Sequence, residues 1–174
     1  MVKRRRWKSK LQVRGVIMKK VVKFGGSSLA NAEQFQKVGD IIRSDESRRY
    51  VVPSAPGKRF DEDIKVTDML YGCYDAASKG EDITEKINAI KARYYEIIKG
   101  LGLSLSLEEE FKKIDEDFRA QAGIQYAASR GEFLNGKIMA AYLGYDFVDA
   151  ASVIRFDKAG NLEAEETNCL LYTS

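Results

Sequence analysis

The sequence predicts an α/β fold with a mostly parallel sheet and a large helical insertion. An apolar stretch at residues 19–24 runs into two glycines and then into a helical pattern, which gives the order strand, turn, helix. A second strand-like run at residues 50–52 follows, and such β-α-β units normally form parallel pairs with a right-handed crossover. From 66 to 121 only helical patterns occur, so we expect this block to pack on the sheet as an insertion.

Strands and helices are assigned from spacing and from turn residues. Residues 19–24 should be a mostly buried strand, 145–148 a third strand, and 153–156 a short fourth one. Apolar residues recur at helical spacing within 32–43, 66–77, 83–98, 107–118 and 134–142. Asn31, or alternatively Ser28, is a candidate N-cap of the first helix, and glycines at 80, 100 and 144 end others. A loop is expected from residue 54, and its acidic continuation at 60–65 is expected to be mobile.

Composition narrows the possible chemistry. The chain has 174 residues, 44% of them hydrophobic and 32% charged, which fits one globular domain with a core. It has no histidine, which excludes histidine triads and histidine-ligated zinc. Cys73 and Cys169 lack metal-ligand spacing, and we expect both to be reduced. No apolar run approaches the roughly 20 residues that span a bilayer, so a cytoplasmic protein without a membrane partner is expected.

The two ends of the chain differ from the rest. Residues 1–17 are basic and predict a disordered extension, for which a nucleic-acid-binding arm is the alternative. Met18 precedes the first strand and is a second candidate start of the protein. Residues 169–174 show no helix cap and no completed element, and they are interpreted as a non-native tail.

The turn after the first strand is the strongest candidate site. Gly25 and Gly26 allow backbone amides to approach an anion, because no Cβ blocks them. Lys23 adds a positive charge, and Ser27 and Ser28 add hydroxyl groups. This combination is typical of a phosphate site, whereas the simpler alternative is a glycine turn beside a surface lysine.

Several motifs, in order along the chain, resemble those of the aspartate kinases in the amino-acid kinase family. Lys-Phe-Gly-Gly-Ser-Ser at 23–28 is similar to the opening signature of that family, and Val-Val-Pro-Ser-Ala at 51–55 is similar to its second-strand motif. Lys-Val-Thr-Asp at 65–68 and Ser-Arg-Gly-Glu at 129–132 resemble two later motifs. The likeness covers residues 18–168, and it implies the N-terminal part of a three-layer αβα, Rossmann-like kinase domain with its helical insertion at about 66–122.

The resemblance implies phosphoryl transfer from ATP, with Mg²⁺ bound through the nucleotide, to the side-chain carboxylate of L-aspartate. Lys23, Gly25 and Gly26 would then be catalytic and bind phosphate, together with Ser27, Ser28 and Ser54. Thr67 and Glu132 would bind the substrate, with Ser54 beside them. From the residues alone, Thr67 could be an N-cap, Ser54 a turn residue, and Glu132 a first-turn carboxylate that favours the helix dipole.

The sequence also departs from the family pattern. Pro53 stands where an apolar residue is expected, and it removes a backbone donor from the second strand. The nucleotide-binding half and the regulatory domains are absent, so we expect little activity from the chain alone and a homo-oligomer only at full length. Other acceptors in the same family, namely glutamate, acetylglutamate or UMP, remain alternatives, as does a nucleic-acid-binding module.

Overall fold

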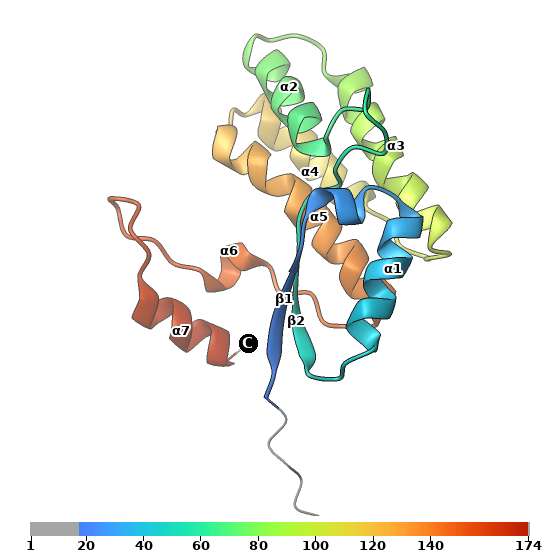
Figure 1. The fold of residues 1–174 in the computed structure, drawn as a ribbon. Helices are drawn as coiled ribbons and strands as arrows, with labels where there is room; N and C mark the ends of the chain where they lie inside the picture. The colour runs from blue at the N-terminus through green and yellow to red at the C-terminus, as the bar shows by residue number, and fades with distance from the viewer. Residues whose placement is uncertain (1–17, 174) are drawn as a thin grey trace, which may run out of the picture.

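The computed structural model describes residues 18–173 as one short sheet and a larger set of helices (Figure 1). The basic segment 1–17, predicted to be a disordered extension, lies outside the described residues. The elements follow in this order: β1 (Lys20–Phe24), the 3-10 helix η1 (Gly26–Leu29), α1 (Ala32–Arg43), β2 (Arg48–Pro53), α2 (Val66–Ser78), α3 (Thr84–Gly100), α4 (Glu108–Arg119), α5 (Ile124–Leu143), α6 (Ala150–Val153) and α7 (Ala164–Thr173).

The β1 and β2 strands pair in parallel, as the β-α-β order predicts. Val22 lies opposite Val51 and Phe24 opposite Pro53, so the strand continues to the proline. Pro53 ends the strand, where a missing N–H does least harm to the ladder. Because both strands end at the same edge, the loops after Phe24 and after Pro53 leave the sheet side by side.

Only one face of this sheet is covered. Val22, Phe24 and Val51 pack against the helical core. On the opposite face Val21 is 69% exposed, and Tyr50 and Val52 are about half exposed. The expectation that residues 19–24 form a mostly buried strand is therefore wrong, because only Val22 and Phe24 are partly buried and the other four residues are exposed. Parallel sheets usually have helices on both faces, and within residues 18–173 no helix covers this one.

The helix that connects the strands begins and packs as its sequence indicates. The side chain of Asn31 accepts a hydrogen bond of 3.0 Å from the amide of Gln34, so Asn31 is the N-cap of α1. Phe35, Val38 and Ile42 of α1 are buried. These side chains belong to the same hydrophobic core as the buried residues of α3 and α5.

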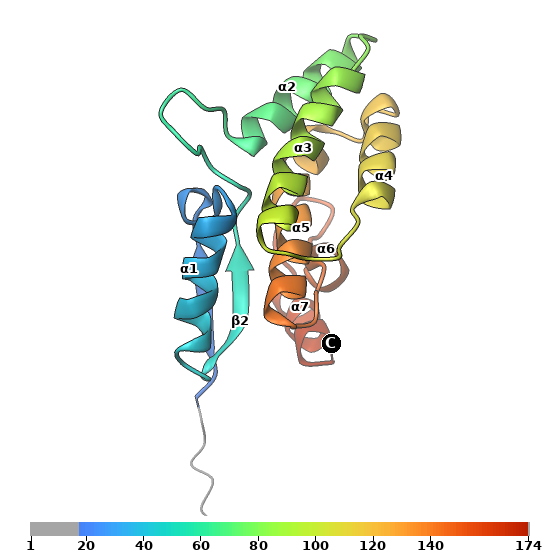
Figure 2. The same cartoon turned by 90° about the vertical axis from the view of Figure 1, so that its right-hand side faces the viewer.

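Helices α2 to α5 form the greater part of the core (Figure 2). Their buried stripes include Leu70 of α2, Ile90 of α3, Phe118 of α4 and Ile138 of α5. The rings of Tyr74 and Phe118 meet edge to face with centroids 5.5 Å apart, which joins α2 to α4. Between 66 and 122 the structure contains helices and turns, as the periodicity predicts.

The segment after α5 differs from expectation. Residues 145–148 do not form a strand, because no neighbouring strand supplies hydrogen bonds, and Phe147 packs against Phe133 of α5 instead. Val153 ends the short helix α6, and Phe156 makes only an isolated antiparallel bridge to Leu162. The predicted third and fourth strands are thus absent from residues 18–173.

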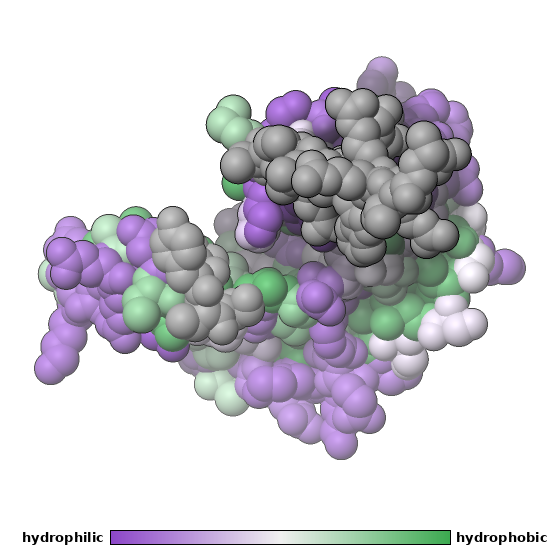
Figure 3. All heavy atoms as spheres, turned by 90° about the horizontal axis from the view of Figure 1, so that it is seen from below, coloured by the Kyte–Doolittle hydropathy of each residue, from purple (hydrophilic) through white to green (hydrophobic). Residues whose placement is uncertain are grey.

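The C-terminal arm, residues 149–173, extends away from the helical body and carries exposed apolar side chains (Figure 1). Ile154, Phe156 and Leu162 are between 37% and 62% exposed. Figure 3 shows apolar surface between this arm, on the left, and the rest of the molecule. Residues 169–173 continue α7, contrary to the expectation that no element is completed there; the non-native origin of 169–174 stays a prediction.

Candidate active site

The turn after β1 presents unpaired backbone donors. Gly25 has an extended conformation, and Gly26 is the first residue of η1. Within residues 18–173 the amides of Gly25, Gly26 and Ser27 donate no hydrogen bond, whereas the amide of Ser28 donates to the Gly25 carbonyl at 3.1 Å. Consecutive amides without an acceptor at the start of a helical turn are suited to bind an anion. Lys23 is exposed and is the penultimate residue of β1, two residues before Gly25.

The loop after β2 is in direct contact with this turn. The amide of Gly57 donates a 2.8 Å hydrogen bond to the carbonyl of Gly26. A Cβ on Gly26 would lie 2.8 Å from the Ala55 carbonyl oxygen, so only glycine fits at this approach. The close contact explains why the second glycine of the pair is needed, which the sequence alone left open.

Ser54 is the first residue beyond β2 and is held by its backbone. Its amide donates to the Phe24 carbonyl at 3.0 Å, and its carbonyl accepts from the Asn135 side-chain amide at 2.6 Å. Ser54 is therefore more than a surface turn residue, since both of its peptide groups are fixed at the strand ends. Asn135 is fully buried, and its Oδ1 has no hydrogen-bond partner among the described residues.

Asn135 was not predicted as a site residue from the sequence. The sequence did contain an indication: Asn135 follows Glu132 by three residues, and this spacing places both on one side of a helix.

Glu132 lies within α5 and faces the same end of the sheet. Its Oε1 accepts a 3.3 Å hydrogen bond from the amide of Ala55. Because α5 begins at Ile124, Glu132 is in the helix interior, which rules out the alternative of a first-turn carboxylate. Gly131 lets the helix approach closely, since a Cβ there would lie 2.6 Å from that of Ala55.

Thr67 is the second residue of α2 and is half-buried. The N-cap position is taken by Lys65, so the N-cap interpretation of Thr67 does not hold. The amide of Val66 donates to the Pro56 carbonyl at 3.2 Å, which ties the start of α2 to the loop that carries Ser54. Within residues 18–173, Lys23, Ser27 and Thr67 make no hydrogen bond to the other predicted site residues.

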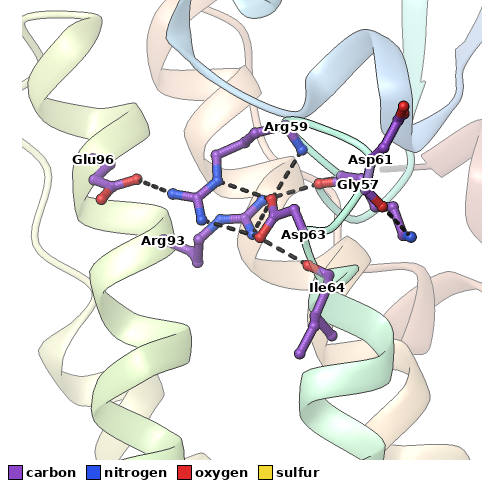
Figure 4. Close-up of polar contacts among 8 residues, drawn as sticks. Gly57, Arg59, Asp61, Asp63, Ile64, Arg93 and Glu96 are labelled. Carbon is purple, nitrogen blue, oxygen red and sulfur yellow. Dashed lines mark hydrogen bonds and ion pairs between the residues drawn. The ribbon is translucent and has the colours of Figure 1, made fainter.

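The loop at 57–64 is fixed by a network of charged side chains (Figure 4). Arg93 of α3 donates to the Gly57 carbonyl at 2.9 Å and to Asp63 at 2.8 Å. Arg59 also bonds Asp63, at 2.9 Å, and reaches Glu96 of α3 at 2.8 Å. Hydrogen bonding by Arg59, with the charge of Arg93, holds the pKa of Asp63 well below its usual range. These contacts hold both ends of the loop, and the mobility expected for residues 60–65 stays a prediction.

Arg93 was also missed from the sequence, although its spacing carries a signal. It follows Ile90 by three residues and precedes Ile97 by four, so it lies on the buried face of α3. The next residue, Tyr94, is fully buried, and its hydroxyl donates to the Gly131 carbonyl at 2.9 Å. Two consecutive residues of α3 therefore contact the two sides of the site.

The residues that the structure describes were also compared with the requirements of a metal site and of a membrane-spanning helix. No group of three or more Asp, Glu, Cys or His side chains is arranged to hold a metal ion within residues 18–173. No helix there combines the length and the hydropathy that crossing a bilayer requires.

A parallel strand pair, a glycine turn whose amides have no acceptor among the described residues, and a glutamate that bonds the neighbouring loop define an α/β protein with a candidate site at one end of its sheet. The chain matches the model of the amino acid kinase family over residues 18–171 and belongs to that family. Its relatives include aspartate kinases. Aspartokinase 3 of Bacillus subtilis is 39% identical over 77% of this chain, and chloroplastic Aspartokinase 1 of Arabidopsis thaliana is 29% identical over 79%. The chain spans only 31% and 25% of these relatives.

Solved structures give the same result for the fold. Aspartate kinase of Clostridium acetobutylicum superposes with a TM-score of 0.84 at 43% identity, over 87% of this chain and 35% of that one. Aspartokinase III of E. coli, solved in complex with aspartate and ADP, gives a TM-score of 0.72 over 88% of this chain and 37% of that one. At 23% identity the second match supports the fold alone. The predicted αβα kinase fold is confirmed as a partial domain.

Proposed function

We propose that this chain supplies the phosphoryl- and aspartate-binding part of an aspartate kinase. The reaction is phosphoryl transfer from MgATP to the side-chain carboxylate of L-aspartate, giving 4-phospho-L-aspartate, the first step towards lysine, threonine and methionine. The observation that supports the proposal is the contact between the loops after the two strands, where the Gly57 amide donates to Gly26 and the Ala55 amide donates to Glu132. We further propose a cytoplasmic enzyme that is a homo-oligomer at full length.

The chemistry requires little beyond charge and position. A carboxylate acceptor is already ionised at neutral pH, so no general base is needed, which agrees with a chain without histidine. Lys23 and the amides of Gly25 and Gly26 would stabilise negative charge on the transferring group. The Mg²⁺ ion would be bound through the nucleotide.

The substrate groups would come from the opposite side of the site. Glu132 would bind the α-ammonium group of aspartate, and the Thr67 hydroxyl would donate to a carboxylate oxygen. Ser54 would lie along the path of the phosphoryl group, and Ser27 and Ser28 would add hydrogen bonds to its oxygens. Holding both reactants in this way accounts for rate acceleration through positioning.

Binding to the 174-residue protein tests the substrate half of the proposal. We expect L-aspartate to shift the backbone NMR signals of Ala55 and Glu132, and Glu132→Gln to weaken binding at least tenfold with an unchanged fold. Glu109→Gln, in the exposed first turn of α4, is the matched control and should bind normally. Stronger binding of L-glutamate, N-acetyl-L-glutamate or UMP than of L-aspartate would contradict the assigned substrate.

Activity tests the phosphoryl half. The chain alone should release little or no ADP in a coupled assay with aspartate, and robust turnover would refute the expectation of an incomplete site. A chimaera that carries residues 18–168 in place of the matching part of Aspartokinase 3 should be active. Lys23→Met in that chimaera should lower kcat about 100-fold or more, because a charge at the transferring group is lost.

A further inference from the structure

The buried guanidinium of Arg93 joins helix α3 to the glycine turn through a single residue. The Nη2 atom of Arg93 donates to the carbonyl of Gly57 at 2.9 Å. The backbone amide of Gly57 in turn donates to the carbonyl of Gly26 at 2.8 Å. We propose that Arg93 is a positioning residue that sets the phosphate-facing turn at Gly25 and Gly26 by way of Gly57. This inference rests on the proposed function of that turn.

The shape of the arginine side chain matters for this role. The Nη1 atom donates to Asp63 at 2.8 Å and to the Ile64 carbonyl at 3.2 Å, while Nη2 reaches Gly57. One planar group thus fixes both ends of the 57–64 loop. A lysine has one nitrogen on a flexible stem and cannot span these acceptors together.

A contribution to stability alone does not account for the buried charge of Arg93 beside Asp63. The side chains of Arg93 and Asp63 are only 5% and 8% exposed, and Nε of Arg93 has no partner among the described residues. Buried ion pairs recover little of the free energy lost on desolvation, and a buried N–H without a partner adds a further cost. What the pair provides is a defined geometry at the Gly57 carbonyl.

Hydrogen exchange on the 174-residue protein separates positioning from simple stabilisation. In Arg93→Lys we expect the Gly57 amide to exchange at least tenfold faster, while the amides of Leu134 and Ile138 in α5 stay within twofold of wild type. Arg119→Lys is the matched control, since this half-exposed arginine of α4 bonds Asp115 away from the site. If the single variant unfolds, the Gly57 amide exchange is measured in the double variant Arg93→Met with Asp63→Leu, which removes both buried charges.

Inorganic phosphate provides the second measurement. At constant ionic strength, phosphate should shift the amide signals of Gly25 and Gly26 in wild type, and the Arg93 variants should bind it at least fivefold more weakly. Unchanged Gly57 exchange in a folded variant, or equal loss of protection at all amides, would overturn the positioning role. If phosphate shifts neither glycine in wild type, the anion site of the proposed function is refuted, and Gly57 exchange still decides whether Arg93 orders the turn.

Discussion

The amide of Gly57 donates a 2.8 Å hydrogen bond to the carbonyl of Gly26, and neither residue has room for a side chain. A Cβ on Gly57 would lie 2.6 Å from the Gly26 carbonyl carbon and 2.8 Å from the Ser27 amide nitrogen. The loops that follow the two strands therefore meet backbone to backbone. This contact fixes the position of the Gly25–Gly26 turn, for which we propose phosphate binding.

Substitution of Gly57 by alanine should disturb this contact directly. We expect Gly57→Ala to lower the free energy of unfolding by about 1–3 kcal/mol, since backbone atoms must move to admit the methyl group. Urea unfolding measures the loss. Gly72→Ala is the control: no atom lies within 4 Å of its Cβ position in α2, and it should stabilise by about 0.5–1 kcal/mol. Equal stability of Gly57→Ala and wild type would contradict the contact.

The low pKa of Asp63 makes stability depend on pH. Because this carboxyl binds its proton less readily in the folded protein than in the unfolded chain, its contribution is fully present above about pH 4 and is lost as the pH falls below it. Urea unfolding between pH 3 and 5 should show a shallower slope for Asp63→Asn, by up to about 1.4 kcal/mol per pH unit.

Salt provides the control for that experiment. The pair is buried, so 0.5 M NaCl should leave the difference between the two slopes nearly intact, unlike that of a surface pair. Parallel slopes for wild type and Asp63→Asn would show that Asp63 does not carry this linkage.

The two thiols should react at very different rates. Cys73 is fully buried in α2, and burial raises the pKa of its thiol to about 11, whereas Cys169 is exposed. Ellman's reagent at pH 8 should titrate one thiol per native chain and two in guanidinium chloride, because the thiolate is the reactive form. Cys169→Ser should remove the fast reaction, and rapid labelling of this variant would contradict the packing around Cys73.

The uncovered sheet face should promote self-association. Val21, Tyr50 and Val52 expose apolar surface on a pair of strands whose outer edges are unpaired within residues 18–173. Sedimentation velocity should show association that increases with concentration, and Tyr50→Lys with Val52→Lys should reduce it. Tyr71→Lys, on a partly exposed position of α2, is the control. A monomer at all concentrations would argue against an adhesive face.

Local patterns predicted most of the helices and the first strand pair because those elements depend on their own residues. The Asn31 cap, the apolar stripe of α3 and the left-handed Gly144 after α5 all act over one or two turns. The segment at 145–148 was mispredicted because a strand also needs a neighbour, which the pattern of one segment does not contain. Here Phe147 finds a partner in Phe133 of α5 instead.

The residues of the candidate site likewise fall into those that a local motif predicts and those that depend on distant contacts. Lys23, Gly25 and Gly26 could be identified from a short motif, since strand, turn and helix are consecutive. The helical spacing of Arg93 indicates only that it lies on the buried face of α3, and its contact with Gly57 could not be predicted, because Gly57 lies 36 residues earlier in the chain. Such contacts depend on how the helices are stacked, and no local pattern encodes that.

Because Arg93 and Tyr94 are consecutive in α3, their contacts restrict where this helix can gain or lose residues. A helix turns by about 100° per residue, so one residue inserted into α3 before Arg93 would rotate both contacts away from Gly57 and Gly131. Insertions and deletions should therefore be tolerated after Gly100, in the connection to α4, and rejected within the first half of α3. A library of single-residue insertions across 84–107 would map that boundary.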